Sequence, residues 1–184
     1  MNKKITKILT ILLVSTFIAC GQTTESNDKE TKLNWETHKA SDYSIQHPDS
    51  WELNQNGLMG TSFILFSPLE SSKDKFRENI NLLIQDLSDY NFDLNEYTKI
   101  SEDQIKTLVT NSILIESKRI KDGSDEYHRM IYTGDQGIFH LKYEQFFWIK
   151  NDKAYILTLT CEQDKFSKFK KMGEAILNSF RFKY

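Results

Sequence analysis

The sequence predicts an α+β fold in which a largely antiparallel sheet carries helices packed on it. Two observations lead to this prediction. Short segments rich in β-branched and aromatic residues follow one another with turn residues between them, and two longer segments switch to a helical period. The resulting order is four strands, a helix, four strands and a helix. Short connections between consecutive strands favour hairpins and therefore antiparallel pairing.

The first four strands are expected in the first half of the chain. One runs over 43–46, and after a Pro-Asp turn at 48–49 a second begins at Trp51. The third lies in GTSFILFSP, residues 60–68, and the fourth in NINLLIQDLS, residues 79–88. In this fourth strand alternate residues are apolar, so one side of it is expected to face a core.

The first helix is expected in DLNEYTKISEDQIKTLVTN, where Asp93 is a suitable N-cap. Its apolar and small residues recur at a spacing of 3.6 and define one buried face. That face contains Leu94, Tyr97, Ser101, Ile105, Leu108 and Val109.

Four more strands follow this helix. They are expected at 112–120, 126–134, 137–150 and 153–162, with hairpin turns at 133–137 and 150–153. In the last two strands neither alternate set is wholly apolar or wholly polar. This mixture is expected when helices or loops cover parts of both faces of a sheet.

The second helix is expected to begin near Asp164, whose side chain can cap the free amides. Its buried stripe contains Phe166, Phe169, Gly173, Ile176, Leu177 and Phe180. Its lysines, the densest basic run of the chain, are interpreted as the solvated side; they are Lys165, Lys168, Lys170 and Lys171.

Residues 1–19 have the build of an export signal. Three lysines precede a twelve-residue apolar stretch from Ile8 to Ala19. Such a stretch covers about 18 Å as a helix, against a hydrocarbon core of roughly 30 Å, so it is too short to span a bilayer. The chain is therefore predicted to be exported.

Cys20 is predicted to be the lipid attachment site of a bacterial lipoprotein. FIAC followed by Gly21 resembles a lipobox, in which the cysteine receives a diacylglyceryl thioether, although Phe17 stands where Leu is usual. The acyl chains are the expected partner of the membrane, since each buried methylene contributes about 0.8 kcal/mol. The alternative is an ordinary signal peptide with an incidental cysteine. Gly21 does not decide which membrane or leaflet holds the anchor.

Three segments follow from these observations: the signal at 1–19, a lipidated and flexible tether at 20–33, and one domain at 34–184. Removing the three signal lysines leaves 21 basic residues against 26 acidic ones, a mature net charge of about −5. This balance argues against a nucleic-acid partner. Cys161, the remaining thiol, lies in an apolar strand and is expected to be buried and inert.

Catalytic and metal-binding patterns are weak in this sequence. The nearest approach to a nucleophile motif is Ser62, at the start of an apolar strand, and no glycine-rich phosphate loop occurs. Among the four histidines, His38 and His47 lack a short ligand spacing. If Thr133 pairs with Gly137, His128 and His140 become diagonal neighbours on one face, with Glu126 and Glu144 on that face, and could hold zinc. The alternative is that these are exposed or hydrogen-bonded histidines on a mixed face, so no metal or cofactor is assigned.

The strand YEQFFWIK is the most aromatic segment. Alternation sends Phe146 and Trp148 to one face of the sheet and Phe147 to the other. Packing on both faces explains these residues, and any exposed remainder would be a docking patch.

The chain resembles the PsbP-like and DcrB-like bacterial domains. The resemblance is carried by YSIQHPDSWEL with FSP, NINLLIQDLS, a helix opening with LNEY, AYILTLTCEQDKFSKF and ILNSFRF, over residues 35–182. It implies an α/β/α sandwich, often on secreted or lipid-anchored proteins that serve as binding or assembly modules without shared catalytic residues.

These observations together predict a lipid-anchored, extracytoplasmic, non-catalytic binding or assembly module with an envelope protein as its partner. The alternatives are a cell-envelope hydrolase with an unrecognised site and a carrier of a small ligand.

Overall fold

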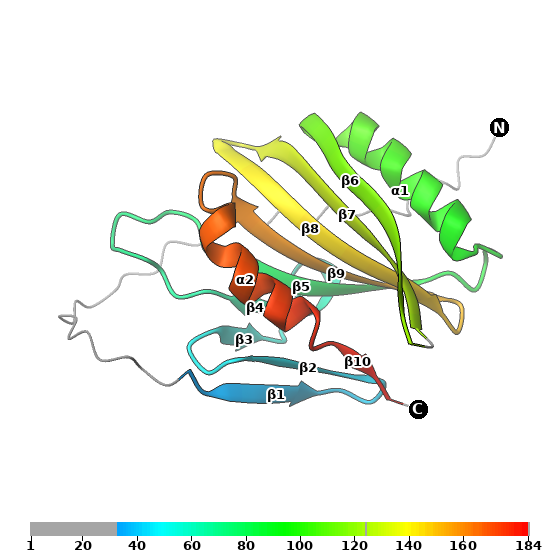
Figure 1. Ribbon diagram of the computed structural model, residues 1–184, viewed down its shortest axis with the longest axis horizontal. Helices are drawn as coiled ribbons and strands as arrows, with labels where there is room; N and C mark the ends of the chain where they lie inside the picture. The colour runs from blue at the N-terminus through cyan, green and yellow to red at the C-terminus, as the bar shows by residue number, and fades with distance from the viewer. Residues whose placement is uncertain (1–32, 124, 184) are drawn as a thin grey trace.

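The computed structural model describes residues 33–123 and 125–183. The predicted signal, Cys20 and most of the tether lie outside these residues and remain predictions. In chain order (Figure 1) the elements are β1 (Trp35–Lys39), β2 (Tyr43–Pro48), β3 (Glu52–Asn54), the 3-10 turn η2 (Leu58–Gly60), β4 (Thr61–Phe66), β5 (Asn79–Asp86), α1 (Leu94–Leu108), β6 (Thr110–Asp122), β7 (Asp125–Gln136), β8 (Phe139–Lys150), β9 (Lys153–Glu162), α2 (Phe166–Leu177) and β10 (Arg181–Phe182).

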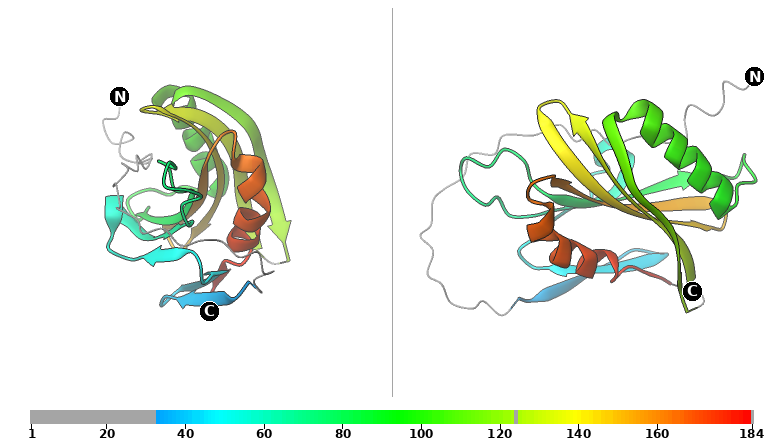
Figure 2. Two further views of the ribbon diagram at one scale, coloured as in Figure 1. Left: turned by 90° about the vertical axis from the view of Figure 1, so that its left-hand side faces the viewer. Right: turned by 45° about the horizontal axis from the view of Figure 1, so that its top comes forward.

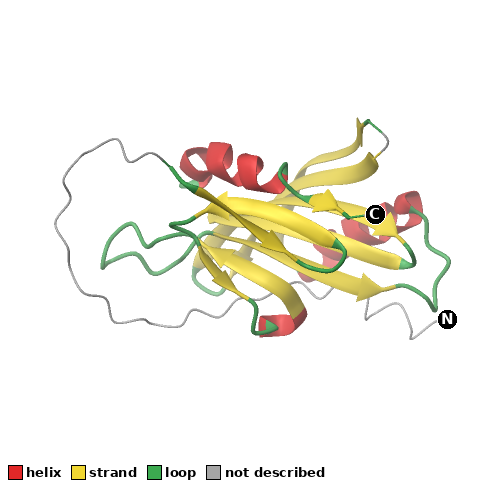
Figure 3. Cartoon of the chain, turned by 90° about the horizontal axis from the view of Figure 1, so that it is seen from below, coloured by secondary structure: helices red, strands yellow, loops and turns green. Residues whose placement is uncertain are grey.

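The strands form two antiparallel sheets. The larger has the order β3-β4-β5-β9-β8-β7-β6 and the smaller the order β1-β2-β10. Figure 3 shows the small sheet from its outer side. The predicted α+β class is confirmed, but the sequence did not predict β1 or β10. β1 is mostly polar and exposed, and β10 has only two residues.

The large sheet separates two cores, each under one helix. We call its two sides the α2 face, which α2 and the small sheet cover, and the α1 face (Figures 1 and 2). Phe146 and Trp148 are buried on the α2 face, and Phe147 is buried on the α1 face. The predicted alternation of this aromatic strand is confirmed, and the aromatic side chains leave little exposed remainder.

Helix α1 begins as predicted. The Asp93 carboxylate accepts hydrogen bonds from the amides of Asn95 and Glu96, and the Glu96 side chain accepts one from the Asp93 amide, which completes a capping box. The end of the buried face is different from the prediction, because Leu108 is 55% exposed. The helix stops there, and Val109 turns inward in its place.

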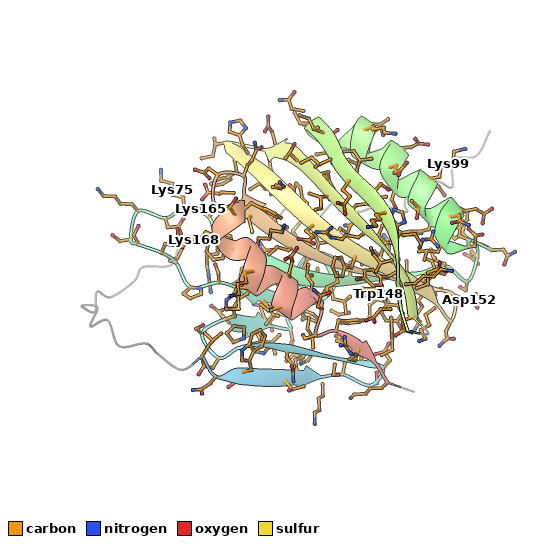
Figure 4. All side chains as sticks on the ribbon, viewed as in Figure 1. Lys75, Lys99, Trp148, Asp152, Lys165 and Lys168 are labelled. Atoms are coloured by element: carbon orange, nitrogen blue, oxygen red, sulfur yellow. The ribbon has the colours of Figure 1, made fainter. Side chains whose placement is uncertain are left out.

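Helix α2 places its predicted stripe on the α2 face, where a Cβ on Gly173 would lie 2.4 Å from Leu159. The predicted cap is wrong: Lys165 is the N-cap residue and no side chain caps the helix. Lys165 is also not a solvated residue. Its Nζ lies 2.9 Å from Asp74 and 2.5 Å from Glu162. The contact with Asp74 joins the start of α2 to the loop 67–78, at the end of the molecule where Figure 4 labels Lys75, Lys165 and Lys168.

One of the two predicted late turns is confirmed. Lys150 pairs with Lys153, and Asn151 and Asp152 between them have φ of 52° and 55°, the left-handed values of a tight hairpin turn. The other turn is displaced, because Gln136 pairs with Phe139 and the chain reverses at 137–138. This displacement changes the whole β7–β8 register.

Cys161 is fully buried on the α2 face, and burial raises the pKa of its thiol above the ordinary value. The predicted inert environment is confirmed. Neither helix among the described residues has the length and apolar character that a bilayer span requires.

Candidate functional site

The two histidines of the late hairpin lie apart. His128 pairs with Phe147 and His140 pairs with Asp135, a shift of five positions from the register expected for a turn at 133–137. A shift by an odd number of positions puts the two imidazoles on opposite faces. His128 lies opposite position 147, seven residue steps along β8 from His140, so the two rings are roughly 24 Å apart. The zinc site considered for this pair is therefore excluded.

Each of these histidines has its own partner. His140 is exposed, and its Nδ1 lies 2.6 Å from Oδ1 of Asp135, whose Oδ2 accepts a hydrogen bond from Asn111. The bonds from Asn111 and His140 lower the pKa of Asp135. His128 is buried against Phe147 on the α1 face. Glu144, which was expected to share this face, lies on the opposite one beside Arg129.

The other two histidines are closer than their spacing in the sequence indicated. His38 pairs with Ile45 and Glu36 pairs with His47, so the imidazoles are diagonal neighbours on one face of the β1–β2 hairpin. Burial lowers the pKa of His38, and His47 lowers it further. Within residues 33–123 and 125–183, however, no three His, Cys, Asp or Glu side chains are arranged to hold a metal ion.

Sequence reasoning missed a serine that has both a histidine and an acid beside it. Ser117 Oγ lies 2.7 Å from His128 Nε2 and donates to Glu102 Oε1 at 2.5 Å. Three elements contribute these groups, since Ser117 is on β6, His128 on β7 and Glu102 on α1. Spacing along the chain gives no sign of such a cluster.

The direction of the hydrogen bonds in this cluster is wrong for nucleophilic catalysis. Arg119 Nε donates to His128 Nδ1 at 3.4 Å, so the neutral ring carries its proton on Nε2 and donates it to Ser117. A base that activates serine must accept the serine proton, and an acid must stand at its other nitrogen. Here a guanidinium stands there, and burial, then Arg119, lower the pKa of His128. The hydrogen bonds of Glu102, Ser117 and His128 instead join α1 to β6 and β7.

Ser62, the nearest approach to a nucleophile motif in the sequence, has the Tyr43 side chain as a hydrogen-bonding neighbour.

A partly buried ion cluster lies on the α2 face, around the fully buried Glu144. Arg129 donates to Glu144 at 2.7 Å and to Glu116 at 2.6 Å, and it approaches Glu174 of α2 at 3.3 Å. Burial raises the pKa of Glu144 above its ordinary value, although the bond and charge of Arg129 act in the opposite direction. This cluster joins β6, β7, β8 and α2, and its groups are occupied with one another.

The α1 face carries the feature that best fits a binding site. Six hydrogen-bonding side chains occupy two adjacent rows across β5, β9 and β8 on this face, and we call them the polar grid. One row is Asn79, Thr160 and Tyr143, and the other is Asn81, Thr158 and Gln145. Their exposed fractions are only 1% to 7%, in the middle of the sheet, where apolar side chains are usual.

The hydrogen-bonding capacity of the polar grid is only partly used. Gln145 donates to Thr158 at 3.0 Å, and Asn79 Nδ2 donates to the Arg77 carbonyl at 3.1 Å. Asn79 Oδ1 is buried without a donor. Among the described residues, the side chains of Asn81 and Thr160 make no hydrogen bond. A buried polar atom without a partner costs about 1–3 kcal/mol, so this arrangement favours an additional group that supplies the missing bonds.

The polar grid contains no charged side chain. Burial raises the pKa of Tyr143 to about 12, so its hydroxyl stays neutral and able to donate. The ring of Tyr132 on β7 stacks on the ring of Tyr143, with 4.7 Å between the ring centroids. It extends the row of Asn79, Thr160 and Tyr143 to β7. Helix α1 packs mainly on β6 and β7 (Figure 2), and its Tyr97 hydroxyl reaches Gln85 in the last part of β5. The grid is suited to hold an uncharged ligand through hydrogen bonds.

Comparison with known proteins identifies the fold. No family model and no curated protein sequence matches the chain. Three solved structures match with a TM-score of 0.57. Cyanobacterial PsbP (CyanoP) from Synechocystis sp. PCC 6803 is 14% identical, over 86% of this chain and 98% of that one. LpqN of Mycobacterium tuberculosis, which is involved in cell envelope biogenesis, is 8% identical, over 84% and 94%. PA94 of Pseudomonas aeruginosa, of unknown function, is 13% identical, over 79% and 94%.

These matches show that the chain has a PsbP-like fold, which confirms the resemblance found in the sequence. At 8–14% identity the likeness concerns the fold alone.

Proposed function

We propose that this chain is an exported, lipid-anchored and non-catalytic binding module, and that its polar grid holds an uncharged ligand. The observation that carries this proposal is Asn79 Oδ1, an acceptor in a side chain only 1% exposed, which lacks a donor beside the unpaired Asn81 and Thr160. A ligand with hydroxyl or amide donors satisfies all three residues. A charged ligand would remain without a counter-charge in the grid.

The cellular setting of the proposal comes from the sequence and one comparison. Cys20 follows a signal-like segment and stands in a lipobox-like context. LpqN, which shares the fold, is involved in cell envelope biogenesis. Both support an envelope role for this chain, with an envelope protein as a further partner.

The hydrolase alternative is less well supported. The Ser117 cluster is the closest approach to a catalytic arrangement, and its histidine donates to the serine. A carrier of a small ligand is compatible with the polar grid, and an exchange assay would separate a carrier from a fixed receptor.

Native mass spectrometry of the protein purified from its own envelope tests the ligand. We expect a bound mass on the wild type that is lost in the Asn81→Leu/Thr160→Val variant. A matched control is Asn56→Leu/Thr37→Val, which changes the same residue types at exposed positions. A wild type without bound mass, or a variant that keeps it, contradicts the proposal.

Incorporation of labelled palmitate tests the anchor. We expect the label and membrane association in the wild type and neither in Cys20→Ala. Unlabelled wild-type protein in the culture fluid would overturn the lipid-anchored part of the proposal and leave the ligand proposal standing.

A further inference from the structure

The loop 67–78 and the start of β1 lie at the same end of the molecule. Figure 1 shows the loop projecting at the left with the start of β1 below it, and Figure 3 and the right-hand view of Figure 2 agree. β1 begins at Trp35, just after the tether predicted at 20–33. The turn between β7 and β8 adjoins the loop, because the ring centroids of Phe76 and Phe139 lie 5.2 Å apart. The proposed anchor is therefore attached to the domain at this end.

Large apolar side chains are exposed at this end. Ile138 in the β7–β8 turn is 79% exposed, and Leu69 in the loop is 43% exposed. Leu33 and Trp35, at the start of β1, are exposed to about the same extent as Leu69. Neither of the two cores includes any of these four side chains. Apolar side chains on a projecting loop can enter the headgroup layer of a membrane, and tryptophan is enriched at that depth.

The loop 67–78 is held in one shape by its own hydrogen bonds. The Asp74 carboxylate accepts from the amide of Glu70 at 3.2 Å and from the amide of Phe76 at 3.4 Å. Arg77 Nε donates to the Ser67 carbonyl at 2.7 Å, across the base of the loop. A contact made by such a loop loses little conformational entropy, because the exposed side chains are already positioned.

The acids near the loop are engaged with the protein. Residues 67–78 and 162–168 contain five acids and five bases, so their charges balance in number. Glu78 is fully buried. Three further acids contact Lys165 or Lys168; they are Glu70, Asp74 and Glu162. Only the fifth acid, Asp164, is both exposed and without an ion pair among the described residues.

Two lysines of the loop point away from these acids. Lys73 and Lys75 are exposed on either side of Asp74, whose side chain is almost wholly buried, and neither is in an ion pair among the described residues. Figure 4 labels Lys75 at the outer end of the loop. Arg77, in contrast, pairs with Glu52 at 2.7 Å. The outer side of the loop therefore combines Leu69 with two free ammonium groups, a combination that suits the interface of a bilayer.

The proposed anchor brings a bilayer to this end of the domain. A flexible chain with the length of the predicted tether, 20–33, has an end-to-end distance of about 20 Å. The bilayer is then present at a high effective concentration, and even a weak contact with it is populated. A partner protein at this end would have to fit between the domain and the membrane. The bilayer is therefore the occupant that the position of the tether favours.

We propose that this end of the domain lies on the surface of the bilayer that holds the anchor. Leu69 and Trp35 enter the headgroup layer, and Lys73 and Lys75 lie beside lipid phosphates. The proposal rests on the lipid anchor of the proposed function. It adds to that anchor a second, weaker contact, which orients the domain on the membrane.

Quenching of tryptophan fluorescence by brominated lipid chains tests this contact. The mature protein is coupled through Cys20 to vesicles of phosphatidylcholine, phosphatidylglycerol and a maleimide lipid, since Cys161 is buried. In a Trp35→Phe background the remaining native tryptophans are buried, so Leu69→Trp reports on the loop. Leu108→Trp, at an exposed leucine of α1, is the matched control. We expect at least about twofold more quenching in Leu69→Trp than in Leu108→Trp.

Charge reversal tests the two lysines. In the Leu69→Trp protein, Lys73→Glu/Lys75→Glu is expected to lower the quenching by about half in vesicles that contain phosphatidylglycerol. The matched control is Lys99→Glu/Lys118→Glu, which reverses two exposed lysines on α1 and β6 and is expected to leave the quenching unchanged.

The proposal is overturned if neither tryptophan is quenched, if both are quenched equally, or if the two charge reversals act alike. Because the maleimide lipid replaces the natural anchor, these outcomes do not depend on acylation. Palmitate incorporation without quenching would overturn the contact and leave the anchor standing. Quenching without palmitate incorporation would remove the anchor, and with it the natural setting of the contact.

Discussion

The two faces of the same three strands differ in chemistry. On the α2 face, β5, β9 and β8 carry fully or nearly fully buried apolar residues; these include Ile80, Leu82, Leu157, Leu159 and Phe146. On the α1 face, the intervening positions hold the polar grid. The two faces of one sheet therefore have different roles. The apolar α2 face stabilises the fold, and we propose that the α1 face binds the ligand.

The largest expected effect is on the apolar face. Leu157→Ala removes a side chain with 0% exposure and should lower the free energy of unfolding by about 4 kcal/mol. Thr158→Ala, one residue along and in the polar grid, should lower it by about 1 kcal/mol. Urea denaturation measures both. Equal losses of unfolding free energy in the two variants would contradict the proposed difference between the two faces.

The ion cluster should give the next effect. Arg129→Met leaves Glu144, with a fully buried side chain, without its counter-charge and should cost about 3 kcal/mol. The double variant Arg129→Met/Glu144→Gln should recover most of this loss, because no buried charge remains. Chemical denaturation of the three proteins forms the test. A double variant that is as unstable as Arg129→Met would show that the loss comes from packing.

Glu78 should make stability depend on pH. It is fully buried, Oε1 has no partner, and burial raises its pKa above the ordinary 4.5. The folded state therefore favours the protonated form, whose contribution is complete below pH 4.5 and is lost as the pH rises through the folded pKa. We expect Glu78→Gln to equal the wild type at pH 4 and to exceed it increasingly toward pH 7 in denaturation experiments. A gap that narrows with pH would contradict this.

The smallest stability effect is expected in the polar grid. Asn81 makes no side-chain bond among the described residues, so Asn81→Leu should change the free energy of unfolding by less than about 1 kcal/mol. The same change should abolish ligand binding, which native mass spectrometry measures. A large destabilisation would instead make the grid a structural feature.

The elements of the fold followed from local sequence, but their register did not. The residues around Asp93 predict a capping box because the pattern is contained within four residues. The segment TGDQG has two glycines that a turn could use. Gly137, with φ of 60°, is in the turn, whereas Gly134 is needed because a Cβ there would lie 2.1 Å from Val109. That contact joins distant parts of the chain, so the local residues of this segment could not show which glycine is in the turn.

The candidate site was missed for a similar reason. Asn79, Asn81 and Thr158 alternate with apolar residues, and this pattern ordinarily indicates a strand with one solvated side. Their burial becomes visible only when three strands are aligned. The diagonal approach of His38 and His47 across β1 and β2, and the contact of Ser117 with Glu102, also depend on elements that meet in space.

The small sheet determines how the domain bears mechanical load. β2 is the neighbour of both β1 and β10, and Ser44 pairs with Lys39 on one side and Arg181 on the other. In a chain held by its N-terminus, tension enters at Trp35 and peels β1 from β2 one residue pair at a time. Five residue pairs between β1 and β2 can open before the force reaches the strands of the large sheet. The β1–β2 pairing would therefore give way first when the proposed anchor pulls on the domain.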